Sequence, residues 1–432
     1  MEEKKLAKMR KSNMKLYPIY KMIGLDWIFY YGVQILFLTQ VKNIEPSDII
    51  LSSSIYSFFS IVFQVPSVIL LERIGKKNGI VLGQLLNAIS MIIIILCPNY
   101  TCLIIAQIIC AFGFGIKGIA ESNFLNSSIP QSKRKGEIFS KIDGKGYSKF
   151  CYIGATSVLI SGFLYSLNPY IPLILCLAFN ILSMIIAMNF VDIEKLEKNG
   201  EEEAIQDSIK KTGKELKDSF KFVFKSTRLK TLLMMNGILW GLLMLISNYQ
   251  ETILKELEIP SYYIGIILAA FQLLVGIFST KSIDFHNRFH NKSLTIIGLL
   301  LTIGSLIVGI ALILPLPFAI QLLLIIAAFI ARAYSKGVYQ INKKRYMGNF
   351  SSPKVLPEIY SINGIYSNLG RMIFGFLGSM LLKATDTATA SLWMGIVSTI
   401  LIGCIYYYMK KRLGLKPEEY PVKEIQYDTM EK

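Results

Sequence analysis

The chain has 432 residues, of which 53% are hydrophobic and 17% are charged, and its mean hydropathy is +0.48. A soluble globular domain does not combine these proportions, so the composition excludes that class of protein. The formal net charge is +17. In a soluble protein this excess would suggest nucleic-acid binding, so its distribution along the chain decides what it means.

Apolar runs of about 20 residues follow one another along almost the whole chain. A helix of that length crosses roughly 30 Å of hydrocarbon, whereas the strands of a membrane barrel would show shorter, alternating segments. The sequence therefore predicts an all-α membrane protein with twelve transmembrane helices. The expected spans are 16–40, 47–71, 79–97, 101–127, 148–166, 170–191, 229–250, 260–280, 293–314, 317–341, 358–382 and 388–409.

The basic residues are distributed unevenly between the loops. About 38 Lys and Arg residues fall in the termini and the even-numbered loops, and three (Lys42, Lys255 and Lys383) fall in the odd-numbered loops. This asymmetry follows the positive-inside rule. It predicts a multi-pass protein of the cell membrane with both termini in the cytoplasm, an uncleaved first helix and no nucleic-acid partner.

One long polar stretch, between the sixth and seventh spans, divides the chain. In its second part Leu216, Phe220 and Phe224 lie four residues apart with lysines between them, which predicts an amphipathic helix on the anionic inner leaflet. The predicted segments are an N-terminal six-helix half (1–191), a cytoplasmic linker (192–230), a C-terminal six-helix half (231–412) and a cytoplasmic tail (413–432).

Short internal matches at an offset of about 220 residues relate the two halves. They fall in corresponding spans and in the same order, which favours two pseudo-symmetric halves related as parallel repeats. The matches pair KGIAESN (117–123) with KGVYQIN (336–342), EIFSKIDG (137–144) with EIYSING (358–364), and Arg73, Lys77 and Gly83 with Arg288, Lys292 and Gly298.

The segment FQVPSVILLERIGKK (63–77) ends the second span and turns into the cytoplasm. A glycine there lets the backbone reverse between two helix ends that carry opposite charges. The residues of this turn are Glu72, Arg73, Gly75, Lys76 and Lys77.

In this turn the chain resembles the major facilitator superfamily, whose loop between helices 2 and 3 carries glycine, three residues, an acid, arginine, any residue, glycine and two basic residues. Val68 stands where the first glycine is usual, and Glu72 replaces aspartate. The resemblance implies the superfamily fold. It also implies that Glu72 contacts a neighbouring helix end, with helix 11 as the neighbour, in one access state and releases it in the other. The alternative is that these charges only anchor the helix end at the membrane interface.

Charged side chains inside the spans are costly and usually functional. Lys117 and Glu121 lie four residues apart on one helix face and can pair. Asp26 and Lys117 each lie about ten residues from the cytoplasmic end of their spans, at a depth of about 15 Å, and could meet. The intramembrane charges are Asp26, Lys117, Glu121, Arg332, Lys336 and Arg371.

The resemblance implies that helices 1, 4, 7 and 10 line a central cavity, which places all of these charges except Arg371 there. Tyr30, Tyr31, Trp240 and Tyr339 would add aromatic faces that accommodate bulky amphipathic molecules. The alternatives are a satisfied structural network for the charges and ordinary packing for the aromatic rings.

The fourth span, GFGIKGIAESNFLNSS, resembles bacterial facilitators of drug-exporter type, with Glu121 at the glutamate of that pattern. Lys117 departs from the pattern, as does Gln64, where an acid is usual. We therefore expect a secondary transporter that exports small amphipathic molecules by proton antiport and alternating access. Energy coupling needs a titrating group, and Glu121 is the first candidate, followed by Asp26.

Two other functions stay open. Lys117 and Lys336 occupy pseudo-symmetric positions and would suit an anionic solute. Alternatively, the chain is an immunity or sensing protein that binds a ligand on a transporter scaffold without turnover. The expected partners are a small-molecule substrate, protons or another coupling ion, and the lipid bilayer, with the chain as a monomer.

The sequence does not predict an enzyme. It has no nucleotide-binding signature and no constellation of nucleophile and base, so we expect no catalytic residue and no cofactor. His286 and His290 lack further ligands, so no metal site is expected. Cys97 and Cys102 face each other across an outer turn, where either a disulfide or two free thiols can be accommodated.

Overall fold

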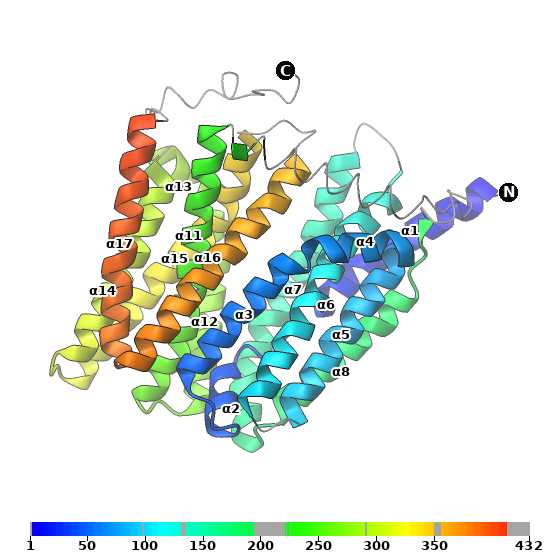
Figure 1. Ribbon diagram of the computed structural model, residues 1–432. Coiled ribbons are helices and arrows are strands. Elements are labelled where there is room, and N and C mark those ends of the chain that lie inside the picture. Colours follow the sequence, from blue (N-terminus) through cyan, green and yellow to red (C-terminus); the bar gives the residue numbers. More distant parts are fainter. Residues whose placement is uncertain are drawn as a thin grey trace. The chain divides into compact units, whose positions relative to one another are not determined.

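The computed structural model describes residues 2–96, 99–130, 135–193, 221, 223–224, 226–289, 292–349 and 356–412. Long helices dominate these residues and none of them lies in a strand, which confirms the all-α prediction (Figure 1). The helices are α1 (Glu2–Gly24), α2 (Gln34–Gln40), α3 (Pro46–Val62), α4 (Gln64–Ile74), α5 (Lys76–Leu96), α6 (Tyr100–Ser128), α7 (Lys135–Leu167), α8 (Ile171–Met188), α11 (Thr227–Glu256), α12 (Ser261–Thr280), α13 (Ser282–Phe289), α14 (Ser293–Ile313), α15 (Phe318–Asn349), α16 (Leu356–Ala384) and α17 (Thr387–Arg412).

Nine of the described helices are long and apolar enough to cross a membrane, or ten if α3 and α4, which are bent by 54°, form one span. The expected first span is divided into α1 and α2 by a non-helical segment. In α16, polar residues such as Asn363 and Arg371 lower the hydropathy of the expected eleventh span. A multi-pass membrane protein is therefore confirmed, and the count of twelve stays a prediction.

The chain forms two compact units. Unit 1 consists of residues 1–44, 59–213 and 260–269, and unit 2 of residues 45–58, 214–259 and 270–432. Most of the predicted linker, including Leu216 and Phe220, lies outside the described residues, as does the tail from residue 413 onward. The predicted domain boundaries therefore stay predictions.

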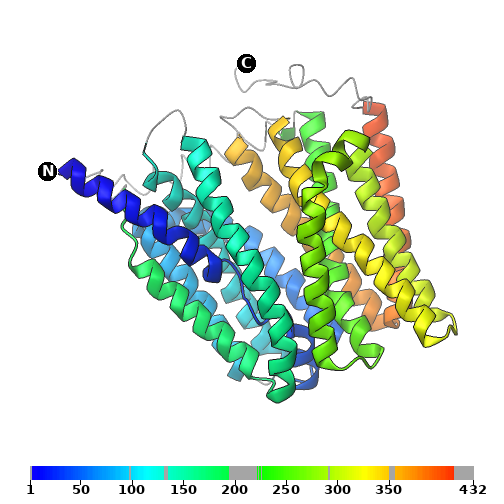
Figure 2. The same cartoon turned by 180° about the vertical axis from the view of Figure 1, so that it is seen from behind.

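Equivalent helices pair in the two units. Helix α5 packs on α6 and α8, and α1 on α7; in unit 2, α14 packs on α15 and α17, and α11 on α16. Figure 2 shows α1 lying across α7 and α8. Because the same pairs of spans meet in each unit, the packing follows the pseudo-symmetry that the internal matches predict.

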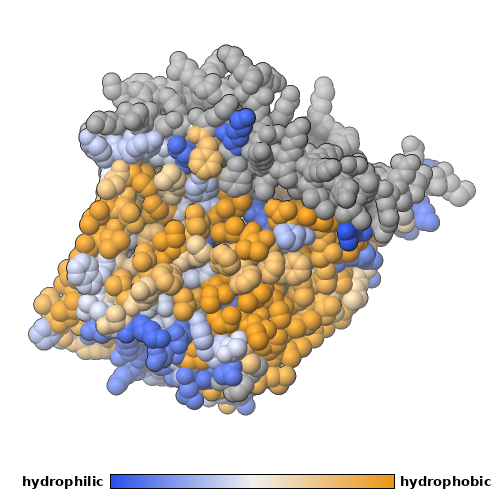
Figure 3. Space-filling view, viewed as in Figure 1, coloured by the Kyte–Doolittle hydropathy of each residue, from blue (hydrophilic) through white to orange (hydrophobic). Residues whose placement is uncertain are grey.

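Apolar side chains also cover the outward surface of the helices. In unit 2, Ile303, Leu323, Met380 and Ile400 are each at least 50% exposed, and Figure 3 shows hydrophobic residues over α14, α16 and α17. Water would disfavour exposed apolar side chains in this number, whereas lipid chains are as apolar as the side chains themselves.

Glycines let α5 and α6 approach closely. A Cβ atom added at Gly113 would lie 2.6 Å from Asn87 Oδ1 and 3.0 Å from the carbonyl oxygen of Gly83, whereas one added at Gly118 would meet nothing within 4 Å. Both positions lie in α6. An alanine at Gly113 and an alanine at Gly118 therefore add the same methyl group to α6, once at a packed position and once at an open one.

We predict that Gly113→Ala lowers the free energy of unfolding by about 1–3 kcal/mol, because the added methyl overpacks the α5–α6 contact. Gly118→Ala should be neutral or stabilise by less than about 1 kcal/mol, since alanine favours helix and meets no neighbour. Thermal denaturation of the two purified variants checks this pair. Equal melting temperatures would contradict the close packing of α5 on α6.

Candidate functional site

The first span is interrupted at its centre. Helix α1 ends at Gly24, the chain continues without helix to Val33, and α2 begins at Gln34. Within the break Phe29 adopts φ 69°, in the left-handed region. Because the break leaves helix-end carbonyl groups without backbone partners at membrane depth, other donors have to satisfy them.

Lys117 on α6 supplies those donors. Its side chain is 2% exposed, and its Nζ donates to the carbonyl oxygens of Gly24 at 2.6 Å and Leu25 at 3.1 Å. The ammonium group also lies 4.2 Å from the centroid of the Phe114 ring. A cation at a helix C-terminus interacts favourably with the helix dipole. Lys117 therefore caps the first half of the broken span.

Glu121 does not pair directly with Lys117. Its Oε1 accepts a hydrogen bond of 2.6 Å from the hydroxyl of Tyr20, and that hydroxyl accepts one of 3.2 Å from Gln84 Nε2. The same Gln84 nitrogen donates to the Gly24 carbonyl at 2.8 Å. The carboxylate and the ammonium group are thus connected through Tyr20, Gln84 and one backbone carbonyl, all of them buried.

Asp26 lies in the break itself. One of its carboxylate oxygens accepts a hydrogen bond of 2.9 Å from the backbone N–H of Trp27. Lys117 binds the carbonyl groups just before Asp26 and forms no ion pair with its carboxylate. Lys117 thus contacts the backbone beside Asp26, and the predicted meeting of the two charged side chains stays a prediction.

Aromatic rings surround the break. The Trp27 ring lies 5.4 Å from that of Tyr30 and 6.0 Å from that of Phe114, and the rings of Tyr30 and Tyr31 are 5.8 Å apart. Tyr31 is 47% exposed, whereas Trp27 and Tyr30 are buried. The predicted pair Tyr30 and Tyr31 therefore belongs to an aromatic cluster next to Lys117.

The charged turn after the second span lies between α4 and α5. Gly75 separates these helices with φ 83°, a conformation that glycine adopts without strain. The side chains of Glu72 and Arg73 are exposed. Asp192, from the segment after α8, accepts hydrogen bonds from the backbone N–H groups of Lys76 at 2.6 Å and Lys77 at 3.3 Å. An acid from outside the motif therefore caps the N-terminus of α5.

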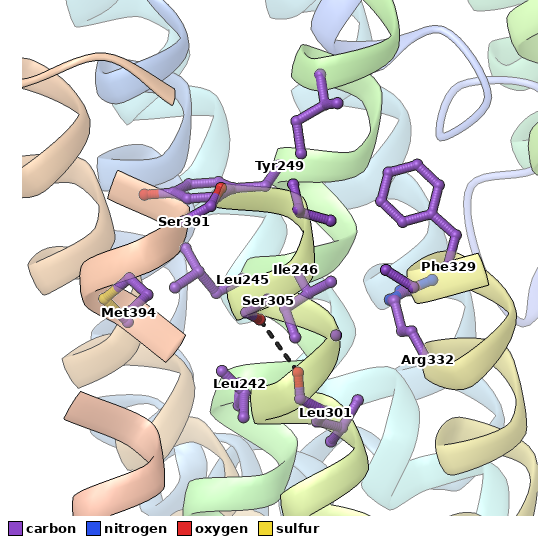
Figure 4. A pocket seen from close by; sticks show the side chains of 14 residues that line it. Leu242, Leu245, Ile246, Tyr249, Leu301, Ser305, Phe329, Arg332, Ser391 and Met394 are labelled. Carbon is purple, nitrogen blue, oxygen red and sulfur yellow. Dashed lines mark hydrogen bonds between the residues drawn. The ribbon is translucent and has the colours of Figure 1, made fainter. Parts of the chain in front are cut away.

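In unit 2, Arg332 on α15 is 6% exposed. Its Nη1 donates to Gln250 Oε1 at 2.7 Å, and its Nη2 lies 3.5 Å from the carbonyl oxygen of Leu243. Figure 4 shows it beside a cavity that α11, α14, α15 and α17 line. The cavity has a volume of about 20 Å³, which is room for one or two waters.

Other predicted residues of unit 2 have separate contacts. Tyr339 is buried and donates to the carbonyl oxygen of Asn236 at 3.0 Å. Lys343 Nζ lies 5.0 Å from the Trp240 ring and 5.1 Å from the Tyr339 ring. Lys336 is partly exposed on α15. Lys117 and Lys336 belong to different units, so the proposed facing of the two lysines stays a prediction.

Arg371 lies on α16, where its guanidinium is 4.8 Å from the centroid of the Tyr56 ring on α3. Both residues belong to unit 2. A cation above an aromatic face is a favourable contact that needs no carboxylate. Arg371 therefore supports the packing of α3 on α16.

Sequence reasoning missed several of the polar residues that complete these sites. Gln84 and Gln250 are uncharged, so a search for charges inside the spans does not find them. Asp192 is the first residue of the predicted linker, and nothing in its position along the chain indicates that it caps α5. A search for amides in apolar runs would have found both glutamines, because a buried amide needs partners just as a charge does.

The described residues include five of the six cysteines and one of the two histidines. Among the described residues no group of three or more metal-ligating side chains occurs. Cys102 is disulfide-bonded, and Cys110, Cys151, Cys176 and Cys404 are free. Cys97 and His290 lie outside the described residues, so the pairing of Cys97 with Cys102 stays a prediction.

The fold and its apolar helices define a polytopic membrane protein, and comparison with known proteins identifies its family. The sequence profile of the Major Facilitator Superfamily matches residues 16–331. The chain therefore belongs to this superfamily and is a transporter rather than an enzyme, as the sequence predicted. It is 23% identical over 277 residues to the uncharacterized MFS-type transporter YxaM of Bacillus subtilis (strain 168), an alignment that covers 64% of this chain and 67% of YxaM.

Solved structures show the same fold at low identity. The nucleoside transporter NupG matches with a TM-score of 0.70 and 14% identity, covering 93% of this chain and 99% of NupG. A D-xylose–proton symporter matches with a TM-score of 0.70 and 13% identity, covering 92% of this chain and 97% of the symporter. A bacterial homolog of the human lysosomal transporter Spinster has a TM-score of 0.67 and 13% identity, with coverages of 94% and 98%.

We predict that Lys117→Gln lowers the melting temperature of the protein without any ligand. The substitution removes the donor to the Leu25 carbonyl, and a buried group left without a partner costs about 1–3 kcal/mol. Lys383→Gln is the control, because the Lys383 side chain is 65% exposed. If Lys117→Gln melts at the wild-type temperature, Lys117 does not cap α1.

Asp192→Ala should destabilise the protein by about 0.5–2 kcal/mol, the usual cost of removing a helix cap. Asp192→Asn should retain most of the stability, because asparagine is also a good cap although it lacks the charge. Thermal melts of both variants measure the difference. A loss that is equal in the two variants would mean that the charge of Asp192, rather than its two hydrogen bonds to α5, accounts for its effect.

Proposed function

We propose that this transporter exports small amphipathic molecules in exchange for protons. The observation that carries the proposal is the position of Glu121. Its carboxyl group is buried in a membrane-spanning helix, and its hydrogen-bond donor is the neutral hydroxyl of Tyr20. A carboxyl group without a direct ion pair can gain and lose a proton with little change in its contacts, as a coupling group must.

The surroundings of Glu121 support an amphipathic substrate. The same unit holds the aromatic cluster of Trp27, Tyr30, Tyr31 and Phe114, and Tyr31 is the exposed member. Aromatic faces with a few polar groups bind bulky, partly apolar molecules. The comparison with a D-xylose–proton symporter supports proton coupling on this fold but not a direction of transport.

An anionic substrate held by Lys117 and Lys336 is less well supported. The ammonium group of Lys117 already binds two backbone carbonyls, so binding an anion there would compete with the capping of α1. A sensing or immunity protein without turnover would share the fold and the ligand site. It differs from a transporter only in the absence of flux.

Contacts at the outer ends of four spans support alternating access. Residues 260–269, the start of α12, cluster with unit 1, and residues 45–58 of α3 cluster with unit 2. A Cβ atom on Gly265 would lie 3.0 Å from the Cα of Gly162 on α7, and one on Gly375 of α16 would contact Ser54. In an alternating-access cycle these helix pairs separate when the outer side opens.

We predict that Glu121→Gln abolishes proton-driven transport in proteoliposomes but retains substrate binding and counterflow, because the amide accepts the Tyr20 hydrogen bond without titrating. An imposed pH gradient and a panel of cationic and neutral amphipaths provide the assay. Glu256→Gln is a matched control, since Glu256 accepts a 2.5 Å hydrogen bond from the hydroxyl of Thr387. Wild-type flux in Glu121→Gln across all pH gradients would overturn the coupling role, and binding without any flux in the wild type would favour the sensing protein.

The double variant Gly162→Cys, Gly265→Cys tests alternating access. The Cβ atoms of a disulfide lie about 3.5–4.5 Å apart, which this close approach allows. Oxidation should stop flux by at least about tenfold, because it locks α7 to α12, and a reducing agent should restore flux. The two single variants control for the native cysteines. Full flux in the cross-linked protein would show that this contact does not open during transport.

A further inference from the structure

Arg332 is a buried cation that forms no ion pair with any described carboxylate. It lies inside the span Phe318–Lys343 and is 6% exposed. Its two partners among the described residues are the amide oxygen of Gln250 and the carbonyl oxygen of Leu243, both uncharged. No described carboxylate lies within salt-bridge distance of its guanidinium. Arg332 differs in this respect from Lys117, whose ammonium group caps the C-terminal end of α1.

An uncompensated charge at this depth is expensive. Transfer of an isolated ion from water to a low-dielectric interior costs several kcal/mol even after relaxation, and guanidinium does not lose its proton in proteins. Charged groups in membrane spans therefore pair with one another, with backbone carbonyls or with a transported ion. One short bond and one long bond to neutral oxygens compensate only part of the charge of Arg332.

The unpaired polar atoms of Arg332, of its partner Gln250 and of Ser391 on the cavity wall are of one kind. Arg332 Nε, Gln250 Nε2 and Ser391 Oγ are buried and have no hydrogen-bond partner among the described residues. Each carries hydrogen, so each can donate, and Arg332 and Ser391 both line the cavity. Donors grouped around a positive charge complement an acceptor that carries negative charge.

The remaining lining limits what such an acceptor can be. Leu242, Leu245, Ile246, Val308 and Met394, which line the cavity, are apolar, and Figure 4 shows Leu242, Leu245 and Ile246 near Ser305. The cavity has a volume of only about 20 Å³, whereas pockets for drug-sized ligands measure roughly 300–1,000 Å³. A single atom or a group of three or four atoms fits, with at most a short apolar chain.

We propose that Arg332, with Gln250 and Ser391, binds one small monovalent anionic group, a halide ion or a carboxylate, inside the helix bundle of unit 2. The site is separate from Glu121 and its aromatic cluster, which belong to unit 1. The inference concerns binding, so it holds whether or not the proposed export function is correct. A resident halide would neutralise the arginine permanently, whereas a carboxylate would make the site selective for organic acids.

The test is the melting temperature of the purified protein at constant ionic strength in sodium gluconate, chloride, acetate or butyrate. Gluconate is the reference, because its long polar chain does not fit an apolar cavity of this size. An anion at about 100 times its dissociation constant should raise the melting temperature by on the order of 4 °C. Arg332→Gln should lose this rise and Arg332→Lys should retain part of it, while Lys383→Gln, which removes an exposed cation, should retain all of it.

The pattern of responses distinguishes the two sources of the anionic group. A rise with chloride indicates a halide site, and a rise with acetate and butyrate alone indicates recognition of a carboxylate group. Equal melting temperatures of the wild type in all four salts, or an undiminished rise in Arg332→Gln, would overturn the proposal. If Arg332→Gln does not fold, Ser391→Ala replaces it, with the expectation of at least a threefold weaker anion affinity. Proteoliposome flux of the same carboxylates reports separately on transport.

Discussion

The bond between Lys117 and the end of α1 is the contact on which the site of unit 1 depends. Within hydrocarbon, a broken helix is tolerated only if something other than water satisfies its terminal carbonyls. Lys117 and Gln84 do this from two different helices. Through Gln84 and Tyr20 the same network reaches the carboxylate of Glu121. The break therefore fixes the position of the aromatic cluster and of the carboxyl group.

The hydrogen-bond network of Lys117, Gln84, Tyr20 and Glu121 depends on a break in the first span that α11, the corresponding helix of unit 2, does not have. The counterpart of the first span, α11, is a continuous helix of 30 residues, so this span has no broken helix end for a lysine to cap. The internal repeat nevertheless places Lys336 at the position that corresponds to Lys117. Lys336 is partly exposed whereas Lys117 is buried, so the two repeats differ in the surroundings of this lysine although equivalent helices pack in the same way.

Much of the fold could be predicted from the sequence because the bilayer imposes it. The lengths of the apolar runs gave the helices, and the matches such as EIFSKIDG with EIYSING indicated the pairing of equivalent spans. The break after Gly24 could not be found in this way, because the segment LDWIFYYGV is as apolar as its neighbours and hydropathy does not report backbone conformation. The capping of α5 by Asp192 was equally invisible, since the contact joins residues more than 100 positions apart in the chain.

The charged residues of the candidate site could be predicted from the sequence, but their partners could not. A charge inside a span is conspicuous, so Lys117, Glu121 and Arg332 were all singled out, but the sequence does not show which partner each charge takes. Lys117 and Glu121 share one helix face, and that spacing favours an ion pair. The structure instead gives each of them its own partner, because Tyr20 and the Gly24 carbonyl lie closer than the opposite charge. The charge of Lys117 is thus stabilised by two neutral carbonyl groups and an aromatic face, whereas the five N–H donors of Arg332 have only two neutral acceptors among the described residues.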